Sequence, residues 1–227
     1  MGEKEEVTDV EYYRTIDSPT LSNAIERLGV RPNERGFTPL EIRSLFPEFG
    51  RMCGYAVTAQ VETVTEMQPF TIDTFIELYR AVEAAPKPAV VVLQEIGAFG
   101  NYAAHCGEVM ASFFTRLGAA GLVTDCAVRD LPEVRRLGFQ YFARGAVASH
   151  ANFRIVRVGL PVQICGMVVR ANELVHGDEN GVLVIPGVER KRIAEEVELI
   201  RRRERIVMDF VRGEGFSLDG FRGLVVE

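Results

Sequence analysis

GLVTDCAVRD, residues Gly121–Asp130, is the stretch from which we interpret the fold and the site. Its apolar first half is short enough for a buried strand, and the loop that follows presents Arg129 and Asp130 side by side. About one helix upstream, Gly107–Ala111 (GEVMA) opens a segment whose apolar residues recur at helical spacing. Together with the apolar run Ala89–Gln94, the order strand, loop, helix, strand predicts two loops at the carboxyl ends of neighbouring strands, where α/β sheets bind ligands.

The residues of these two loops suit a small oxoacid that chelates a metal. A glycine turn at a helix start offers free backbone N–H groups to an anion. Arg129 adds a forked cation for a carboxylate. Asp130 and Glu108 add the hard oxygen ligands that Mg²⁺ or Mn²⁺ prefers.

Each of these residues also has a simpler structural interpretation, which the sequence leaves open. An adjacent Arg–Asp pair at the end of a loop is commonly a solvated corner. Asp130 precedes Leu131 and Pro132, so it is also placed to cap the next helix. Glu108 lies in the first turn of a helix, where the helix dipole favours an acidic residue in any case.

Composition narrows the class of protein. A chain of 227 residues forms one domain, or one domain with extensions, and a net charge of −6 makes nucleic acid an unfavourable partner. The four cysteines form no C-x-x-C pair, which argues against a zinc finger or a redox motif. The acidic start is neither a signal nor a transit peptide, and no apolar run approaches the ~20 residues of a membrane span. We therefore expect a cytoplasmic protein without a membrane partner.

Periodicity and turn signals predict the remaining elements. The expected helices are Ser18–Leu28, Pro69–Ala85, Leu131–Leu137 and the long Val188–Arg212. The expected strands are Gly54–Val64, Gln140–Ala143, Ile155–Leu160, Val162–Val169 and Val182–Pro186. Val30–Pro47 is expected to be a loop, Gly177–Gly181 a polar turn, and Gly213–Glu227 a tail that is mobile or packs on a neighbouring subunit. The pattern is α/β without a regular βαβ alternation.

Three motifs in order resemble the RraA-like family: GLVTDCAVRD, then FARG at Phe142–Gly145, then HGDENGVLVIP at His176–Pro186. The resemblance covers Ile16 to Pro186. The family includes class II pyruvate aldolases and the regulator of ribonuclease E activity, and it was long misnamed demethylmenaquinone methyltransferase. It implies a three-layer β/β/α swivelling-type domain with N-terminal helices and a long C-terminal helix, assembled as a homotrimer or homohexamer. It also divides the chain into an RraA-like catalytic domain with an N-terminal helical extension, 1–187, and a C-terminal helix and tail, 188–227.

The resemblance implies a metal-dependent lyase that cleaves a 4-hydroxy-2-oxoacid to pyruvate and a second oxoacid, and that decarboxylates oxaloacetate through the same enolate. Asp130 would be the direct ligand of Mg²⁺ or Mn²⁺, and Glu108 would contact the metal through water. Arg129 would hold the substrate and stabilise the enolate. The pyruvate carboxylate would bind at the helix start, formed by Gly107, Glu108, Val109 and Met110.

The chain also departs from the family pattern. Cys126 stands where the family has glycine, which could narrow the pocket, and Ala171–Glu173 replaces the usual Pro-Gly-Asp. His105 could line the pocket, but none of the three histidines has metal-ligand spacing, so we expect them to be solvated or packed. The alternative function is a non-catalytic, oligomeric regulator that binds a ribonuclease or another protein partner.

Overall fold

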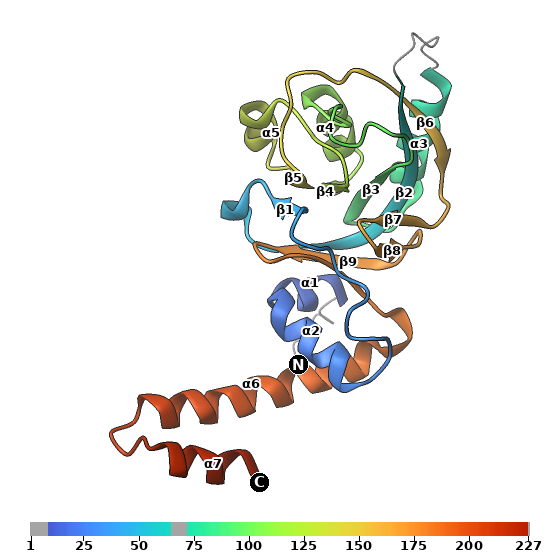
Figure 1. Ribbon diagram of the computed structural model, residues 1–227. Coiled ribbons are helices and arrows are strands. Elements are labelled where there is room, and N and C mark those ends of the chain that lie inside the picture. The colour runs from blue at the N-terminus through green and yellow to red at the C-terminus, as the bar shows by residue number, and fades with distance from the viewer. Residues whose placement is uncertain (1–8, 65–71, 227) are drawn as a thin grey trace, which may run out of the picture.

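The structure is a computed structural model that describes residues 9–64 and 72–226 (Figure 1). Within those ranges the main sheet has eight strands in the order β1-β5-β4-β3-β2-β9-β10, with β6 also paired to β2. The strands are β1 Arg43–Ser44, β2 Met52–Val64, β3 Ala89–Glu95, β4 Ala119–Thr124, β5 Gln140–Ala143, β6 Asn152–Val158, β9 Leu174–Asp178 and β10 Gly181–Ile185.

The long strand β2 curls the sheet because its two halves have different partners along one edge. Met52–Tyr55 pairs antiparallel with β9, whereas Ala59–Val64 pairs antiparallel with β6, and the register shifts at Gln60/Val61. Along its other edge, β2 runs parallel to β3. The strands β2, β3, β4 and β5 are therefore parallel neighbours, and their carboxyl ends meet at one edge of the sheet.

Helices α3 Ile72–Ala84, α4 Glu108–Arg116 and α5 Leu131–Leu137 cover one face of this parallel part. Leu78, Phe114 and Val134 anchor the three helices in that core. The opposite face packs against the hairpin of β7 Val162–Ile164 and β8 Met167–Val169. Because both faces are covered, β3 is a continuous apolar run, as expected for a central parallel strand.

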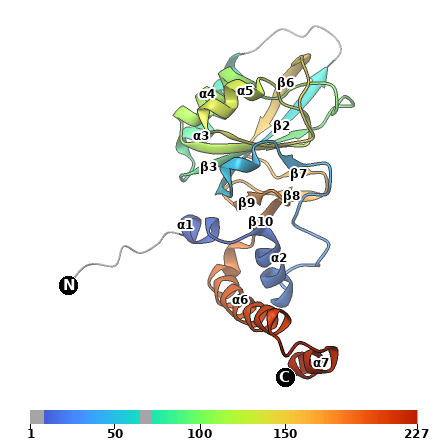
Figure 2. The same cartoon turned by 90° about the vertical axis from the view of Figure 1, so that its left-hand side faces the viewer.

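A third layer lies beyond β9 and β10 (Figure 2). It consists of α1 Asp9–Arg14, α2 Ser18–Arg27 and the start of α6 Arg190–Arg212. Ile193, Val197 and Ile200 of α6 are buried there. The α/β class, the N-terminal helices and the long C-terminal helix predicted from the sequence are confirmed. Across the described ranges, no helix combines the length and the apolar character needed to cross a membrane.

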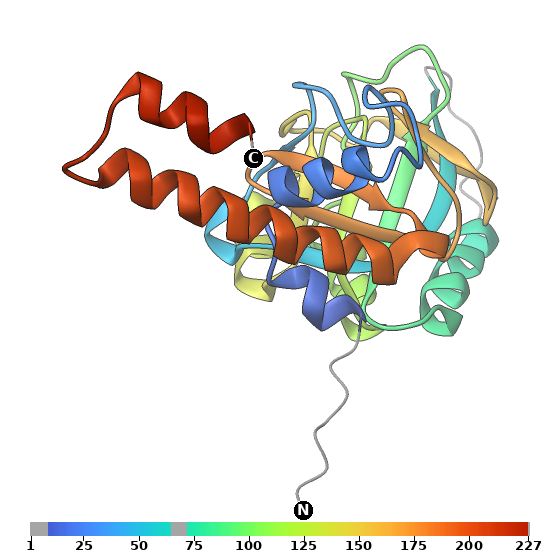
Figure 3. The same ribbon diagram turned by 90° about the horizontal axis from the view of Figure 1, so that it is seen from below.

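The outer half of α6 projects from the body, and the chain then returns as α7, Leu218–Val226 (Figure 3). The ring of Phe216 packs against Phe210, with ring centroids 5.9 Å apart. The sequence did not predict this helix, because Gly215, Gly220 and Gly223 weaken its helical pattern.

Three local predictions need correction. The expected strand Val162–Val169 is a hairpin, because Cys165 and Gly166 both adopt positive φ and reverse the chain. The expected polar turn Gly177–Gly181 is shorter, since the last two residues of β9 are buried and Asp178 accepts the Ser18 N–H at 2.7 Å. The expected loop Val30–Pro47 contains the short strand β1. The predicted start of the helix at Pro69 lies outside the described residues.

Candidate functional site

Asp130 is held in an unusual backbone conformation between β4 and α5. Its φ of 57° and ψ of 43° lie in the left-handed region, which aspartate tolerates better than most residues. A helix-capping residue normally has an extended backbone, and the Asp130 side chain makes no capping bond to α5. Its Oδ2 instead accepts the backbone N–H of Glu108 at 2.9 Å. The alternative that the Asp130 side chain caps α5 is therefore wrong.

Gly107 is required by the close approach of Arg129 and Asp130. It has an extended backbone that any residue adopts, so φ and ψ do not demand glycine here. A Cβ at this position would overlap Asp130 Oδ2 and would lie 2.9 Å from Arg129 Nε. Alanine at this position would therefore displace at least the Asp130 carboxylate.

Short backbone bonds hold the two loops together beneath these side chains. The Arg129 N–H donates to Cys106 O at 3.0 Å, and the His105 N–H donates to Ala127 O at 2.9 Å. Arg129 Nε lies 3.5 Å from Asp130 Oδ2, with about a third of each side chain exposed. An ion pair this exposed contributes little to stability, so both charges stay accessible to a ligand.

The start of α4 retains donors for an anion. Among the described residues we find no acceptor for the N–H groups of Val109 and Met110, which point out of the first turn of the helix. The Glu108 side chain is exposed and makes no hydrogen bond or ion pair with the described residues. The structure thus brings together all the residues that the sequence placed in the site.

The donor set at this site fits a magnesium-like ion. Asp130 offers a second carboxylate oxygen besides the one bonded to Glu108 N–H, and the Glu108 carboxylate lies at the neighbouring helix start. Mg²⁺ typically binds one or two carboxylates and completes its shell with water and substrate oxygens.

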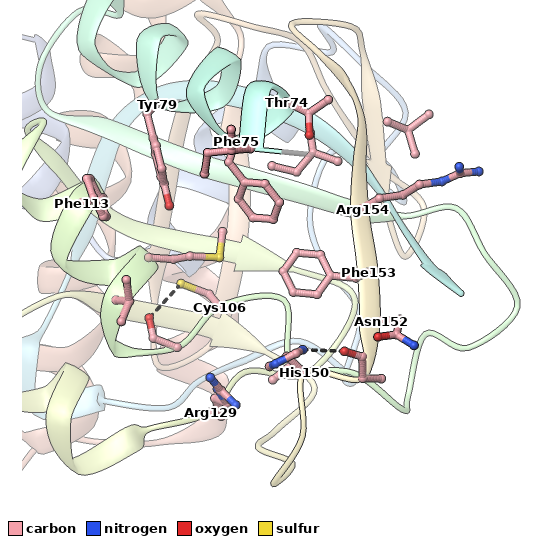
Figure 4. Close-up of a pocket in the computed structure, with 18 of the residues that line it drawn as sticks. Thr74, Phe75, Tyr79, Cys106, Phe113, Arg129, His150, Asn152, Phe153 and Arg154 are labelled. Carbon is pink, nitrogen blue, oxygen red and sulfur yellow. Dashed lines mark hydrogen bonds between the residues drawn. The ribbon is translucent and has the colours of Figure 1, made fainter. Parts of the chain in front are cut away.

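A cavity of about 960 Å³ opens beside this site, between α3, α4 and β6 (Figure 4). Arg129, Gly107, Val109 and Met110 belong to its lining, so the cavity is continuous with the helix start. The rest of the wall is mainly apolar and includes Phe75, Tyr79, Phe113, Phe153 and Ile155. The cavity leaves no signal in the sequence, because its wall is assembled from segments far apart in the chain.

His105 is a packed histidine, as expected from its lack of metal-ligand spacing, and it is not among the residues that line the cavity. It is fully buried, and its Nε2 donates to Glu95 Oε2 at 2.8 Å while its Nδ1 lies 3.2 Å from Thr124 Oγ1. Burial opposes charge on His105, but the neighbouring Cys126 and Glu95 side chains outweigh it and raise its pKa to about 9. Burial likewise opposes charge on Glu95, but bonds from His105, Thr63 and Gly97 lower its pKa to about 2.

Glu95, His105 and Cys126 also place three potential metal-ligand atoms within 4.8 Å of one another. Both ring nitrogens of His105 and both oxygens of Glu95 already have hydrogen-bonding partners. The Cys126 S–H donates to Ala103 O at 2.9 Å, and the side chain is not part of the cavity wall. We therefore interpret the cluster as a buried ion pair that stabilises the two loops of the site. The expectation that Cys126 narrows the pocket does not hold for the described cavity.

A family model described as "RraA-like: Aldolase/RraA" matches residues 18–184. The chain belongs to the RraA-like family. This family includes aldolases and inhibitors of RNase E.

The names of individual relatives refer to both classes. A protein of Halalkalibacterium halodurans named "Putative 4-hydroxy-4-methyl-2-oxoglutarate aldolase" is 27% identical over 212 residues, which cover 91% of each chain. The structure of Streptomyces coelicolor RraAS2, described as an unusual member of the RNase ES inhibitor RraA protein family, shares 25% identity at a TM-score of 0.70. The match covers 91% of this chain and 98% of that one. An uncharacterized protein from Pseudomonas syringae shares the fold at a TM-score of 0.72 and 22% identity, over 94% and 96% of the two chains.

Proposed function

We propose that this protein is a divalent-metal-dependent carbon–carbon lyase. It cleaves a 4-hydroxy-2-oxoacid to pyruvate and a second carbonyl product, and it decarboxylates oxaloacetate through the same pyruvate enolate. The observation that carries the proposal is the arrangement around Gly107, where Arg129 and Asp130 close over the start of α4. The relative named as an aldolase supports the same class of reaction.

The reaction needs an electron sink for one bond cleavage. The C3–C4 bond of the substrate breaks, its electron pair stays on C3 as an enolate, and the C4 hydroxyl loses its proton as C4 becomes a carbonyl. Protonation of C3 then gives pyruvate. With oxaloacetate the same bond breaks and carbon dioxide leaves, so one site serves both reactions.

Backbone and side-chain groups of the site divide this work according to their positions. The Val109 and Met110 N–H groups bind the substrate carboxylate at the positive end of the helix dipole. The Arg129 guanidinium donates to the substrate oxygens on which negative charge develops. Glu108 is free to orient the water that exchanges a proton with the substrate. A Mg²⁺ or Mn²⁺ ion held by Asp130, with Glu108 contacting it through water, would supply Lewis acidity.

The test measures oxaloacetate decarboxylation by the purified full chain with Mg²⁺ or Mn²⁺, using coupled detection of pyruvate and a blank with metal alone. We expect Asp130→Asn to lower kcat/KM on the order of 100-fold, since charge stabilisation at a reacting centre is of this size. Asp209→Asn, on the projecting part of α6, is the matched control and should keep full activity.

Two results would contradict the proposal. One is a chain that adds nothing to the metal-only rate. The other is an Asp130→Asn variant that is as active as the parent, when EDTA also leaves the activity of both proteins unchanged. Size-exclusion chromatography with light scattering of the same preparation tests the proposed trimer or hexamer.

A further inference from the structure

The cavity beside Arg129 is much larger than a pyruvate head requires. Its volume of about 960 Å³ lies at the upper end of the range for small-molecule pockets, about 300–1,000 Å³. The site proposed for the oxoacid head involves only Gly107 and Arg129 and their neighbours at the start of α4. Figure 4 shows Arg129 at the edge of the cavity. The remaining volume faces the part of the substrate that departs after C3–C4 cleavage.

Aromatic side chains from three elements form this remaining wall. Phe75 of α3 and Phe153 of β6 face each other with ring centroids 5.8 Å apart. Tyr79 stacks on Phe113 of α4 at 4.7 Å with nearly parallel planes. Half of the Phe113 side chain is exposed, although it lines a concave surface. The exposed part of Phe113 can therefore contact an apolar or aromatic ligand group.

The charges of the lining do not suit a second carboxylate far from the oxoacid head. Among the described lining residues, guanidinium groups come from Arg129 and Arg154. Arg154 is already paired with Glu62 through Nε at 2.9 Å and Nη2 at 2.6 Å. Among the described lining residues none is acidic, and apolar side chains outnumber the polar ones, which besides the two arginines are Thr74, His150 and Asn152. A carboxylate buried against these rings would lose hydration without gaining a free cation.

We infer that the group on C4 of the substrate is a large apolar substituent, aromatic or branched aliphatic, rather than a second acidic arm. This inference rests on the proposed function, because it places the oxoacid head at Arg129 and the α4 start. The second product is then an apolar carbonyl compound, formed by the bond cleavage and proton transfers described above. No further co-reactant is needed.

The experiment compares two retro-aldol substrates that both release pyruvate. One is 4-hydroxy-2-oxo-4-phenylbutanoate, which gives pyruvate and benzaldehyde. The other is 4-hydroxy-4-methyl-2-oxoglutarate, which gives two molecules of pyruvate. We expect kcat/KM to be at least tenfold higher for the phenyl substrate. The difference should lie mainly in KM, because burial of the ring against an apolar wall strengthens binding of the substrate.

A charge added to the apolar wall should reverse this preference. Phe113→Arg places a cation in the cavity at an exposed helical position, so the ratio of kcat/KM for the phenyl substrate over the dicarboxylate should fall by at least tenfold. Ser112→Arg is the matched control, since it adds the same charge on the same helix at an exposed residue outside the lining. Its ratio should equal that of the parent.

The outcomes separate this inference from the proposed function. Activity on oxaloacetate with equal or greater activity on the dicarboxylate keeps the lyase and overturns the apolar substituent. Activity on none of the three compounds refutes the lyase itself. If Phe113→Arg changes the oligomeric state and leaves the substrate ratio intact, the apolar wall is a contact between copies of the chain, and the inference is wrong.

Discussion

Replacing Gly107 with alanine separates a catalytic from a structural role for the Arg129–Asp130 arrangement. The backbone of Gly107 is extended, so alanine introduces no strain in φ or ψ. The added Cβ would overlap Asp130 Oδ2, which is the end of a side chain that can rotate away. We therefore expect the variant to fold while the Asp130 carboxylate moves off the start of α4.

The magnitudes for stability and for activity differ widely. Rotation of Asp130 forfeits its bond to the Glu108 N–H, a charge-assisted bond in a class worth about 1.5–3 kcal/mol. Alanine also lowers the conformational entropy of the unfolded chain, which raises the free energy of unfolding by about 0.4–1 kcal/mol. The net loss of folding free energy is then about 0.5–2.6 kcal/mol, which lowers Tm by roughly 1–10 °C for a chain of this size. A catalytic group misplaced by ~1 Å can cost on the order of 100-fold in rate.

The assay pairs thermal unfolding with oxaloacetate decarboxylation on the same preparation. Gly100→Ala is the matched control, because a Cβ at Gly100 meets nothing closer than Glu95 Cγ at 3.5 Å. A folded Gly107→Ala variant with decarboxylation within about threefold of the parent would refute the reasoning, since the crowded carboxylate would then be dispensable.

Two further predictions concern buried carboxylates. The ion pair of Glu95 and His105 contributes fully between pH 4.5 and 6.5, and its contribution falls as pH rises through the folded His105 pKa of about 9 or drops toward the Glu95 pKa of about 2. Glu95→Gln should therefore lower the free energy of unfolding by about 3 kcal/mol near pH 6 and by clearly less at pH 9, as measured by urea unfolding. A loss that does not depend on pH would contradict the ion pair. Asp178→Ala should lower the free energy of unfolding by about 2–3 kcal/mol in the same assay. The Asp178 carboxylate accepts the N–H groups of Ser18 at 2.7 Å and Asn180 at 2.8 Å, and both donors would lose their partner. A loss below ~0.5 kcal/mol would show that water replaces the carboxylate.

The location of the site was predictable because it depends on local patterns. The apolar runs of β3 and β4, each bounded by turn residues, identify two central strands, and parallel neighbours bring their following loops to one edge. The closeness of Glu108 and Asp130 follows from that topology. The topology does not predict that the Asp130 side chain binds the start of α4. That contact depends on the left-handed backbone of Asp130, which leaves no signal in the sequence.

The cavity and the buried ion pair were not predictable, because both depend on contacts between distant segments. The pairing of Glu95 with His105 requires the loop after β3 to fold inward beneath Phe153 of β6, whose ring lies 5.6 Å from the imidazole. The same packing brings Phe75 and Phe113 into the wall of one cavity. Periodicity assigns Phe75 to the buried face of a helix but does not show that β6 leaves space in front of it.

The projecting arm of α6 gives the molecule a signature in solution scattering. Only the first turns of this 23-residue helix are anchored, and a straight helix of that length spans about 35 Å. A compact chain of 227 residues has a radius of gyration of about 17 Å, and mass carried outward by α6 and α7 raises that value and skews the pair-distance distribution toward long vectors. If the arm folded back onto the body, the radius of gyration would be smaller and the long vectors in the pair-distance distribution would be fewer.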